Sequence, residues 1–375
     1  MVKMESFYHS FKLISPYLKQ DLINQKSLEI MASICANFPG KFTHFWGLEF
    51  RIGEREPIGD ILFEIKRESF GHFFLAGQSA NLFDFLCVKG EIWSKLRHFS
   101  NDWLEKEDLA HNIRNIWLEF DSASLNDINE VNKILEYPSL FWGTYKKPIT
   151  SECWKSIFQI MSSFHDVTLE AKLIYDFVQL LPESAHLFQL GIMISRSQPV
   201  IRLCVNHIPP RNIPDWLERI GWQGNSTALQ KIINTLSSRL KSIAVDIDLT
   251  PNGLKEKIGL ECYIGNWDDC SSEPWLEFLD ILVELGLCLP TKREALLAYP
   301  CRRRITEDTM EVKRTGILYP ILYQNIHHIK INIVNEHIQE AKAYLGVHRP
   351  GINYRNILMK SSEEQTPNQD SWVID

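Results

Sequence analysis

Polar and apolar residues alternate with a period of two in five pairs of short segments along the chain. Charged or tyrosine side chains recur at every second position, with apolar side chains between them. The paired segments are residues 44–52 with 60–66, 114–121 with 139–145, 186–195 with 200–207, 242–249 with 257–264, and 327–334 with 341–348. Successive side chains of a strand point to opposite faces of its sheet. The pattern therefore predicts strands with one apolar and one polar face.

Each strand pair follows a stretch in which apolar residues recur at helical spacing. These stretches are residues 11–36, 79–104, 151–181, 213–240 and 273–298. Breaks near residue 167, at 221–225 and at 286–290 divide three of them into helix pairs. An amphipathic helix needs an apolar surface to cover. If the helices cover the apolar face of the sheet, its polar face points inward.

The repeats predict an α+β fold with one closed sheet. Five strand pairs give ten strands, which is near the limit for a strongly twisted open sheet, and closure removes the exposed edges. A barrel of about eight strands already holds side chains or one small ligand. We therefore expect a closed ten-stranded antiparallel β-barrel from five ααββ repeats, ringed by helices and wide enough for a ligand.

Length and composition are compatible with one domain. At 375 residues, of which 45% are hydrophobic, the chain can bury a large core. The repeats favour a single domain over residues 1–359. Residues 360–375 have the low hydrophobicity that is typical of a disordered tail. Eight cysteines without a C-x-x-C pair argue against the usual zinc and dithiol spacings, and we expect reduced, mostly buried thiols.

Charge and hydropathy narrow the class of partner. The formal net charge of −7 disfavours nucleic acid and anionic membranes as main partners, because both attract basic surfaces. Residues 1–15 lack a basic region followed by an apolar core, and no run reaches about eighteen uncharged apolar residues. We therefore expect a soluble, cytoplasmic protein without membrane insertion.

The alternation identifies the side chains that are expected to face the lumen. Their polar members include seven carboxylates and fewer cations: Glu49, Glu64, Glu119, Asp121, Asp246, Asp248 and Glu261, with Arg51, Lys66, Arg202, Lys330 and Lys342. Buried charges are costly unless they are paired, so these groups must pair with one another, bind a ligand or meet trapped water. Their concentration on one face predicts a site inside the barrel.

The repeats and three short motifs resemble the ABBA-type (PT-barrel) aromatic and peptide prenyltransferases of secondary metabolism. The motifs are Gly47-Leu48-Glu49-Phe50-Arg51, His328-x-Lys330 and Lys342-x-Tyr344. The resemblance implies transfer of an isoprenoid group from an allylic diphosphate to an aromatic, amine- or guanidine-containing, or peptide acceptor. It implies that Glu49 takes a proton from the acceptor or orients it. The diphosphate would be bound by Arg51, Arg202, Lys330, Lys342, Tyr263 and Tyr344.

The acceptor side is predicted from the remaining lumen residues. Glu119 and Glu261 are expected to help Glu49 recognise a cationic or N–H-bearing acceptor, because a surplus of carboxylates suits a guanidinium or an amine. Trp117 is either an acceptor-stacking residue or a core residue. Glu49 and Arg51 also admit a purely structural ion pair, and His328 a structural hydrogen bond.

Two departures from the family pattern stand in the middle strands. Arg202-x-Cys204-x-Asn206 replaces the family's Arg-x-Lys-x-Tyr, and Glu261-x-Tyr263 stands where Lys-x-Tyr is expected. The magnesium motif D-D-x-x-D of other prenyl-transferring enzymes is absent, since Asp268-Asp269 precedes Cys270-Ser271-Ser272. We expect no metal site and no required cofactor, with Mg²⁺ as a possible addition.

Other interpretations remain open. A basic stretch with Arg302, Arg303, Arg304, Lys313 and Arg314 is expected to be a solvated loop or a flap over an anionic ligand. The same barrel also suits a different enzyme that uses its lumen carboxylates, or a non-catalytic barrel that binds a small ligand or a peptide, because a fold does not fix a function.

Overall fold

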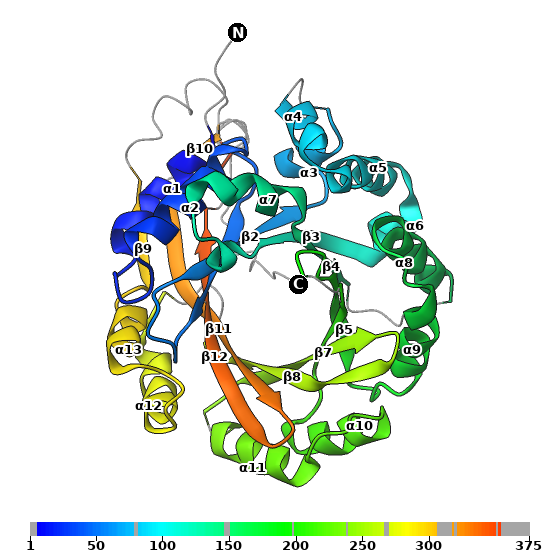
Figure 1. The fold of residues 1–375 in the computed structure, drawn as a ribbon, viewed down its shortest axis with the longest axis vertical. Coiled ribbons are helices and arrows are strands. Elements are labelled where there is room, and N and C mark those ends of the chain that lie inside the picture. The colour runs from blue at the N-terminus through cyan, green and yellow to red at the C-terminus, as the bar shows by residue number, and fades with distance from the viewer. Residues whose placement is uncertain are drawn as a thin grey trace, which may run out of the picture.

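The computed structural model describes residues 6–78, 82–145, 151–196, 199–237, 239–265, 270–305, 317–318, 321–349 and 352–353. Ten antiparallel strands close into a barrel, with helices around it (Figure 1). The predicted tail, residues 360–375, lies outside the described residues. Within these ranges, no helix is long and apolar enough to cross a membrane.

The barrel strands follow the chain in order until the last hairpin closes the sheet. They are β1 (Phe45–Arg51), β2 (Gly59–Lys66), β3 (Ile113–Phe120), β4 (Ser139–Thr144), β5 (His186–Ile192), β6 (Ile201–Asn206), β7 (Ser242–Thr250), β8 (Gly253–Tyr263), β11 (Ile321–Val334) and β12 (His337–His348). Each strand pairs with its sequence neighbour, β8 pairs with β11, and β12 pairs with β1. The predicted closed barrel is therefore confirmed.

Helices form the outer layer. They are α1 (Tyr8–Ile14), α2 (Gln25–Ala36), α3 (Phe70–Leu75), α4 (Leu82–Lys89), α5 (Glu91–Glu105), α6 (Glu107–Asn112), α7 (Val131–Glu136), α8 (Ser151–Phe164), α9 (Thr168–Gln179), α10 (Ile213–Arg219), α11 (Ser226–Ser237), α12 (Leu276–Glu284) and α13 (Pro290–Leu297). The short helices α3, α6 and α7 lie outside the predicted helical stretches. Six residues span too few turns to give a clear helical period.

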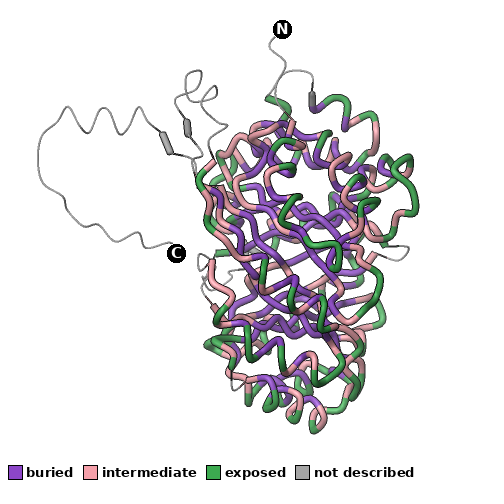
Figure 2. Tube along the Cα trace, turned by 90° about the vertical axis from the view of Figure 1, so that its left-hand side faces the viewer, coloured by how far each residue is buried: buried purple, intermediate pink, exposed green. Residues whose placement is uncertain are grey.

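The main core lies between the sheet and the helices. Outward strand residues such as Leu48, Phe50 and Leu118 are fully buried in one apolar cluster. Helix α2 covers part of it with Ile30 and Ile34, which lie four residues apart on one face. Figure 2 shows the buried strands inside and the exposed segments on the helical surface. Because the outer face is apolar, the polar alternation faces the lumen.

The described part of the basic stretch is a strand, which corrects its prediction as a loop or a flap. Residues Cys301–Arg304 form β9, which pairs with the start of β11 beyond the barrel. The guanidinium of Arg303 lies 3.3 Å from the centre of the Tyr17 ring. Lys313 and Arg314 lie outside the described residues. A further two-stranded sheet joins β10 (Ile317–Leu318) to β13 (Ile352–Asn353).

Candidate functional site

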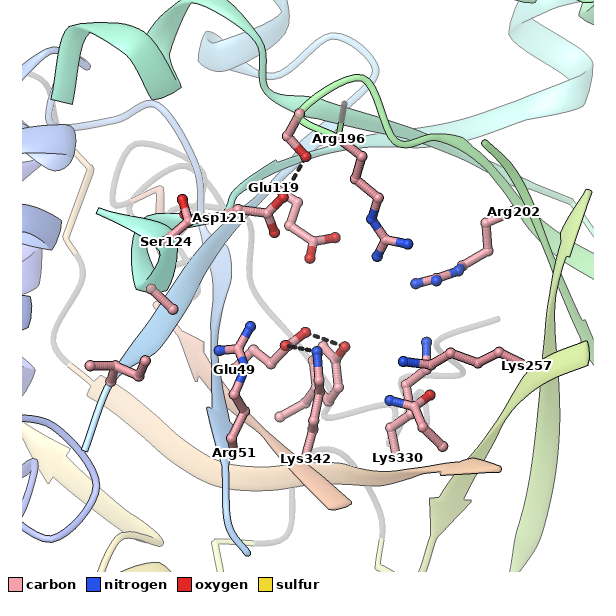
Figure 3. Close-up of a pocket in the computed structure, with 15 residues that line it drawn as sticks. Glu49, Arg51, Glu119, Asp121, Ser124, Arg196, Arg202, Lys257, Lys330 and Lys342 are labelled. Atoms are coloured by element: carbon pink, nitrogen blue, oxygen red, sulfur yellow. Dashed lines mark hydrogen bonds and ion pairs between the residues drawn. The ribbon is translucent and has the colours of Figure 1, made fainter. Parts of the chain in front are cut away.

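A cavity of about 400 Å³ lies in the lumen. Side chains from β1, β3, β6, β8, β11 and β12 line it, together with residues of three loops (Figure 3). The lining residues are Glu49, Arg51, Ile58, Glu119, Asp121, Ala123, Ser124, Ser195, Arg196, Arg202, Lys257, Lys330, Asn332, Lys342 and Tyr344. Its volume falls in the range of small-molecule pockets, which is about 300–1,000 Å³.

Glu49 on β1 is held by two residues of β12. Its carboxylate accepts a hydrogen bond from Lys342 Nζ at 2.7 Å and another from the Tyr344 hydroxyl. The pairing of β1 with β12 puts Glu49 directly opposite Tyr344. Burial raises the pKa of Glu49, but the charges of Lys342 and Arg51 and the two hydrogen bonds outweigh burial and lower the pKa to about 2. Glu49 is therefore ionised at neutral pH.

Arg51 forms an ion pair with Asp60 on the neighbouring strand β2. Its Nη1 donates to Asp60 Oδ2 at 3.1 Å, and Asp60 also accepts the Ala123 N–H at 2.8 Å. Burial, followed by the nearby charge of Glu49, raises the pKa of Asp60 to about 7. The Arg51 side chain thus reaches the cavity while its partner carboxyl stays behind it.

The cations on β6, β8 and β11 have carboxylate partners too. Arg202 makes two hydrogen bonds to Asp248, at 2.7 Å and 3.0 Å, and Lys330 donates to Asp246. Lys257 Nζ lies 3.1 Å from Glu340 Oε1. Because the partner carboxylates Asp246, Asp248 and Glu340 are not lining residues, the cationic ends remain available at the cavity wall.

The cavity is more basic than the sequence pattern suggested. Six cations line it, namely Arg51, Arg196, Arg202, Lys257, Lys330 and Lys342, against the three carboxyl groups Glu49, Glu119 and Asp121. The predicted carboxylate surplus is therefore wrong for the cavity surface. Figure 3 shows Glu119 and Asp121 on one side and Arg202, Lys257 and Lys330 on the other. The cavity is polarised across its width.

Three predicted site residues do not line this cavity, namely Tyr263, Glu261 and Trp117. Tyr263 donates a hydrogen bond to Glu261 at 2.6 Å, and Trp117 packs against the cluster of Phe141, Met193 and Val200. Tyr263 lies six residues along β8 from Lys257, which corresponds to about 20 Å of strand. Alternation predicts the face of the sheet correctly but carries no information on depth along the barrel.

Beyond the cavity lies an aromatic layer, formed by Phe45, Trp117, Tyr263, His327 and His328. Ring centroids are 5.6 Å apart for Phe45 and Trp117, and 5.1 Å apart for Tyr263 and His328. A register shift in β11 between Ile326 and His328 accompanies contacts of both His327 and His328 with Tyr263. The His328 ring also stacks on Tyr344, at 4.2 Å, so this layer adjoins the cavity.

Two cations that line the cavity, Lys257 and Arg196, are not among the predicted site residues. Lys257 shares the parity of Glu261 within a predicted strand, so the alternation contained the signal for it. Arg196 follows β5 in a turn, where no periodicity identifies a side chain. Its guanidinium lies 3.6 Å from Asp248 and its side chain is 39% exposed. Arg196 is therefore the more loosely held of the two arginines beside Asp248.

A metal site is not formed by the part of the chain that the structure describes: no three His, Cys, Asp or Glu side chains there are grouped to hold an ion. Asp268 and Asp269 lie outside that part. The magnesium expectation therefore stays a prediction.

The fold and the cavity define a helix-ringed, ten-stranded barrel with a polar lumen. No family model and no curated protein matches the chain. Among solved structures, the crystal structure of AnaPT from Neosartorya fischeri is similar over 92% of this chain and 91% of that chain, with 13% sequence identity and a TM-score of 0.43. So distant a similarity does not establish a shared activity, and the function proposed below rests on the cavity itself.

Proposed function

We propose that the barrel transfers an isoprenoid group from an allylic diphosphate to an acceptor bound in the same cavity. The observation that carries the proposal is the set of six cations that converge on one cavity, which also contains the acidic groups Glu119 of β3 and Asp121 just after it. When the C–O bond of an allylic diphosphate breaks, negative charge develops on the leaving group and positive charge on the carbon. Preorganised cations stabilise the first charge, while an aromatic ring and a carboxylate stabilise the second.

The buried ion pairs support this chemistry because they hold the cations in place before a substrate arrives. Asp60, Asp248 and Asp246 fix Arg51, Arg202 and Lys330 from behind. Such pairing offsets part of the cost of burying each charge. A diphosphate would then meet donors that need little reorganisation, which is the condition for strong electrostatic stabilisation.

Glu49 is proposed to orient the acceptor. It is 2% exposed, and its low pKa keeps it negative, so it attracts a cation or an N–H group. An amine, a guanidine, an indole-like aromatic or a peptide group offers such a donor. In the presence of a labelled donor, Glu49→Gln should lower turnover strongly while leaving binding of the diphosphate nearly unchanged.

Titration with a nonhydrolysable allylic thiolodiphosphate tests the donor site. Lys257→Gln and Arg196→Gln remove partly exposed cavity cations and should each weaken binding about ten- to hundredfold, the loss expected for one hydrogen bond to a charged group. Lys66→Gln is the matched control, since the Lys66 side chain is 66% exposed and does not line the cavity. Equal affinities for wild type and both cavity variants would remove the donor-site assignment.

A further inference from the structure

Glu119 differs from the other inward carboxyl groups of the barrel. It is 7% exposed and lines the cavity. Glu49, Glu64 and Glu261 each accept a side-chain hydrogen bond, as do Asp60, Asp246 and Asp248. Within the described ranges, no residue donates a hydrogen bond to the carboxyl group of Glu119 or forms an ion pair with it. Figure 3 shows this group pointing into the cavity, with no drawn interaction.

The surroundings of Glu119 favour its protonated form. Burial, followed by the negative charges of Asp121 just after β3, Glu49 on β1 and Asp60 on β2, raises the pKa of Glu119 to about 8, against an opposing effect of Arg202 on β6. Its strand neighbours are Leu62 on β2 and Ser139 on β4, and neither brings a charge. Arg196 completes the charged groups on the adjoining wall. At neutral pH the group therefore carries a proton.

We propose that Glu119 relays a proton from the acceptor to the leaving diphosphate. This inference rests on the proposed function and assigns a residue to its proton transfers. As the allylic C–O bond breaks, its electron pair goes to the diphosphate oxygen, and Glu119 gives its proton to that oxygen. The acceptor then bonds to the allylic carbon and loses a proton to the Glu119 carboxylate. The products are the prenylated acceptor and protonated diphosphate, and Glu119 returns to its initial state.

Glu49 does not suit this relay. Both hydrogen bonds from β12 point at its carboxylate, and its pKa of about 2 leaves no proton to give and little affinity for one. Glu119 instead has a pKa near the working pH, which is the property of an efficient acid and base. It also lies between Asp121 and the arginines Arg196 and Arg202 in the view of Figure 3, facing both sides of the polarised cavity.

Binding of inorganic pyrophosphate tests the relay without turnover. Calorimetry in buffers of different ionisation enthalpy measures the protons taken up on binding. Between pH 8 and 9, wild type should take up more protons than Glu119→Gln, by up to one per site, because the bound anion favours protonated Glu119. The affinity of wild type should then fall relative to that of the variant by up to tenfold per pH unit. The ionisation of pyrophosphate itself is common to both proteins.

Two further variants sharpen the test. Glu64→Gln makes the same substitution at a buried inward carboxyl that does not line the cavity, and should behave like wild type. Asp121→Asn removes a charge that raises the pKa of Glu119, and should shift the extra proton uptake to lower pH. With donor and acceptor present, Glu119→Gln should lose about a hundredfold or more of turnover at pH 7 while still binding pyrophosphate.

The outcomes separate the two proposals. If wild type does not bind pyrophosphate, the donor site is absent, and the proposed function and the relay both fall. If wild type and Glu119→Gln bind pyrophosphate with equal proton uptake across pH 7–9, the diphosphate site stands and the relay is overturned. Full turnover by Glu119→Gln would also overturn it.

Discussion

The two halves of the lumen share one sequence pattern but have different contents. In the cavity, long charged side chains pair across neighbouring strands and leave a space between them. In the aromatic layer, rings of Phe45, Trp117 and Tyr263 together with two histidines contact one another. Charged side chains need a partner or water, so they leave room for water or a ligand between them, whereas aromatic rings pack together and fill the lumen. A ligand site therefore needs the alternation and also the right side chains at one depth.

The largest effect is expected from breaking the ion pair between Glu49 and Lys342, which both line the cavity. Lys342→Met leaves the carboxylate of Glu49 buried without its cation, and should lower the free energy of unfolding by about 3–5 kcal/mol. Adding Glu49→Gln removes the orphaned charge and should recover most of the loss. Urea denaturation of the two variants and wild type measures both changes. A loss that persists in the double variant would contradict the charge explanation.

The contribution of the aromatic layer to stability should instead depend on acid pH. Burial, followed by the charge of Lys330, lowers the pKa of His328 to about 3 from 6.5. As the pH falls below about 6.5, the unfolded chain takes up a proton that the folded barrel refuses, so stability declines. One such histidine contributes about 1.4 kcal/mol per pH unit. In His328→Phe the decline between pH 6.5 and 5 should be smaller by about 2 kcal/mol. Parallel curves for the two proteins would contradict the burial of a neutral histidine.

A smaller change should separate packing from binding. Trp117→Phe shrinks a ring that packs against Phe141 and Met193 but does not line the cavity. We expect it to cost about 1 kcal/mol of stability and to leave pyrophosphate affinity within about twofold, a difference of roughly 0.4 kcal/mol. A large loss of affinity would mean that the two halves act as one site.

The smallest effect is expected at the rim. Lys66 has the parity of a lumen residue, yet its side chain is 66% exposed and lies 4.0 Å from Glu64. Exposed ion pairs contribute about 0–1 kcal/mol, so Lys66→Ala should change stability by less than about 0.5 kcal/mol and leave pyrophosphate binding unchanged.

The barrel can be predicted from the sequence, but only part of the candidate site can. Alternation identifies the inward face of β1 and β12, so the meeting of Glu49, Lys342 and Tyr344 follows once the sheet is closed. It does not give depth along the barrel, so it cannot separate Tyr263, Glu261 and Trp117, which do not line the cavity, from the residues that do. It also has no signal for Arg196, which lies in a turn, or for the pairing of Arg202 with Asp248, which depends on the register between β6 and β7.

Because β12 pairs with β1, the barrel can close only after its last hairpin has been synthesised. Glu49 and Lys342 are 293 residues apart, so at about 5–20 residues per second a ribosome needs roughly 15–60 s to supply the second after the first. Throughout that interval β1 offers one unpaired edge, which is a template for pairing with other chains. The nascent barrel is thus an open sheet until its last hairpin emerges, and the cavity is assembled in the final step.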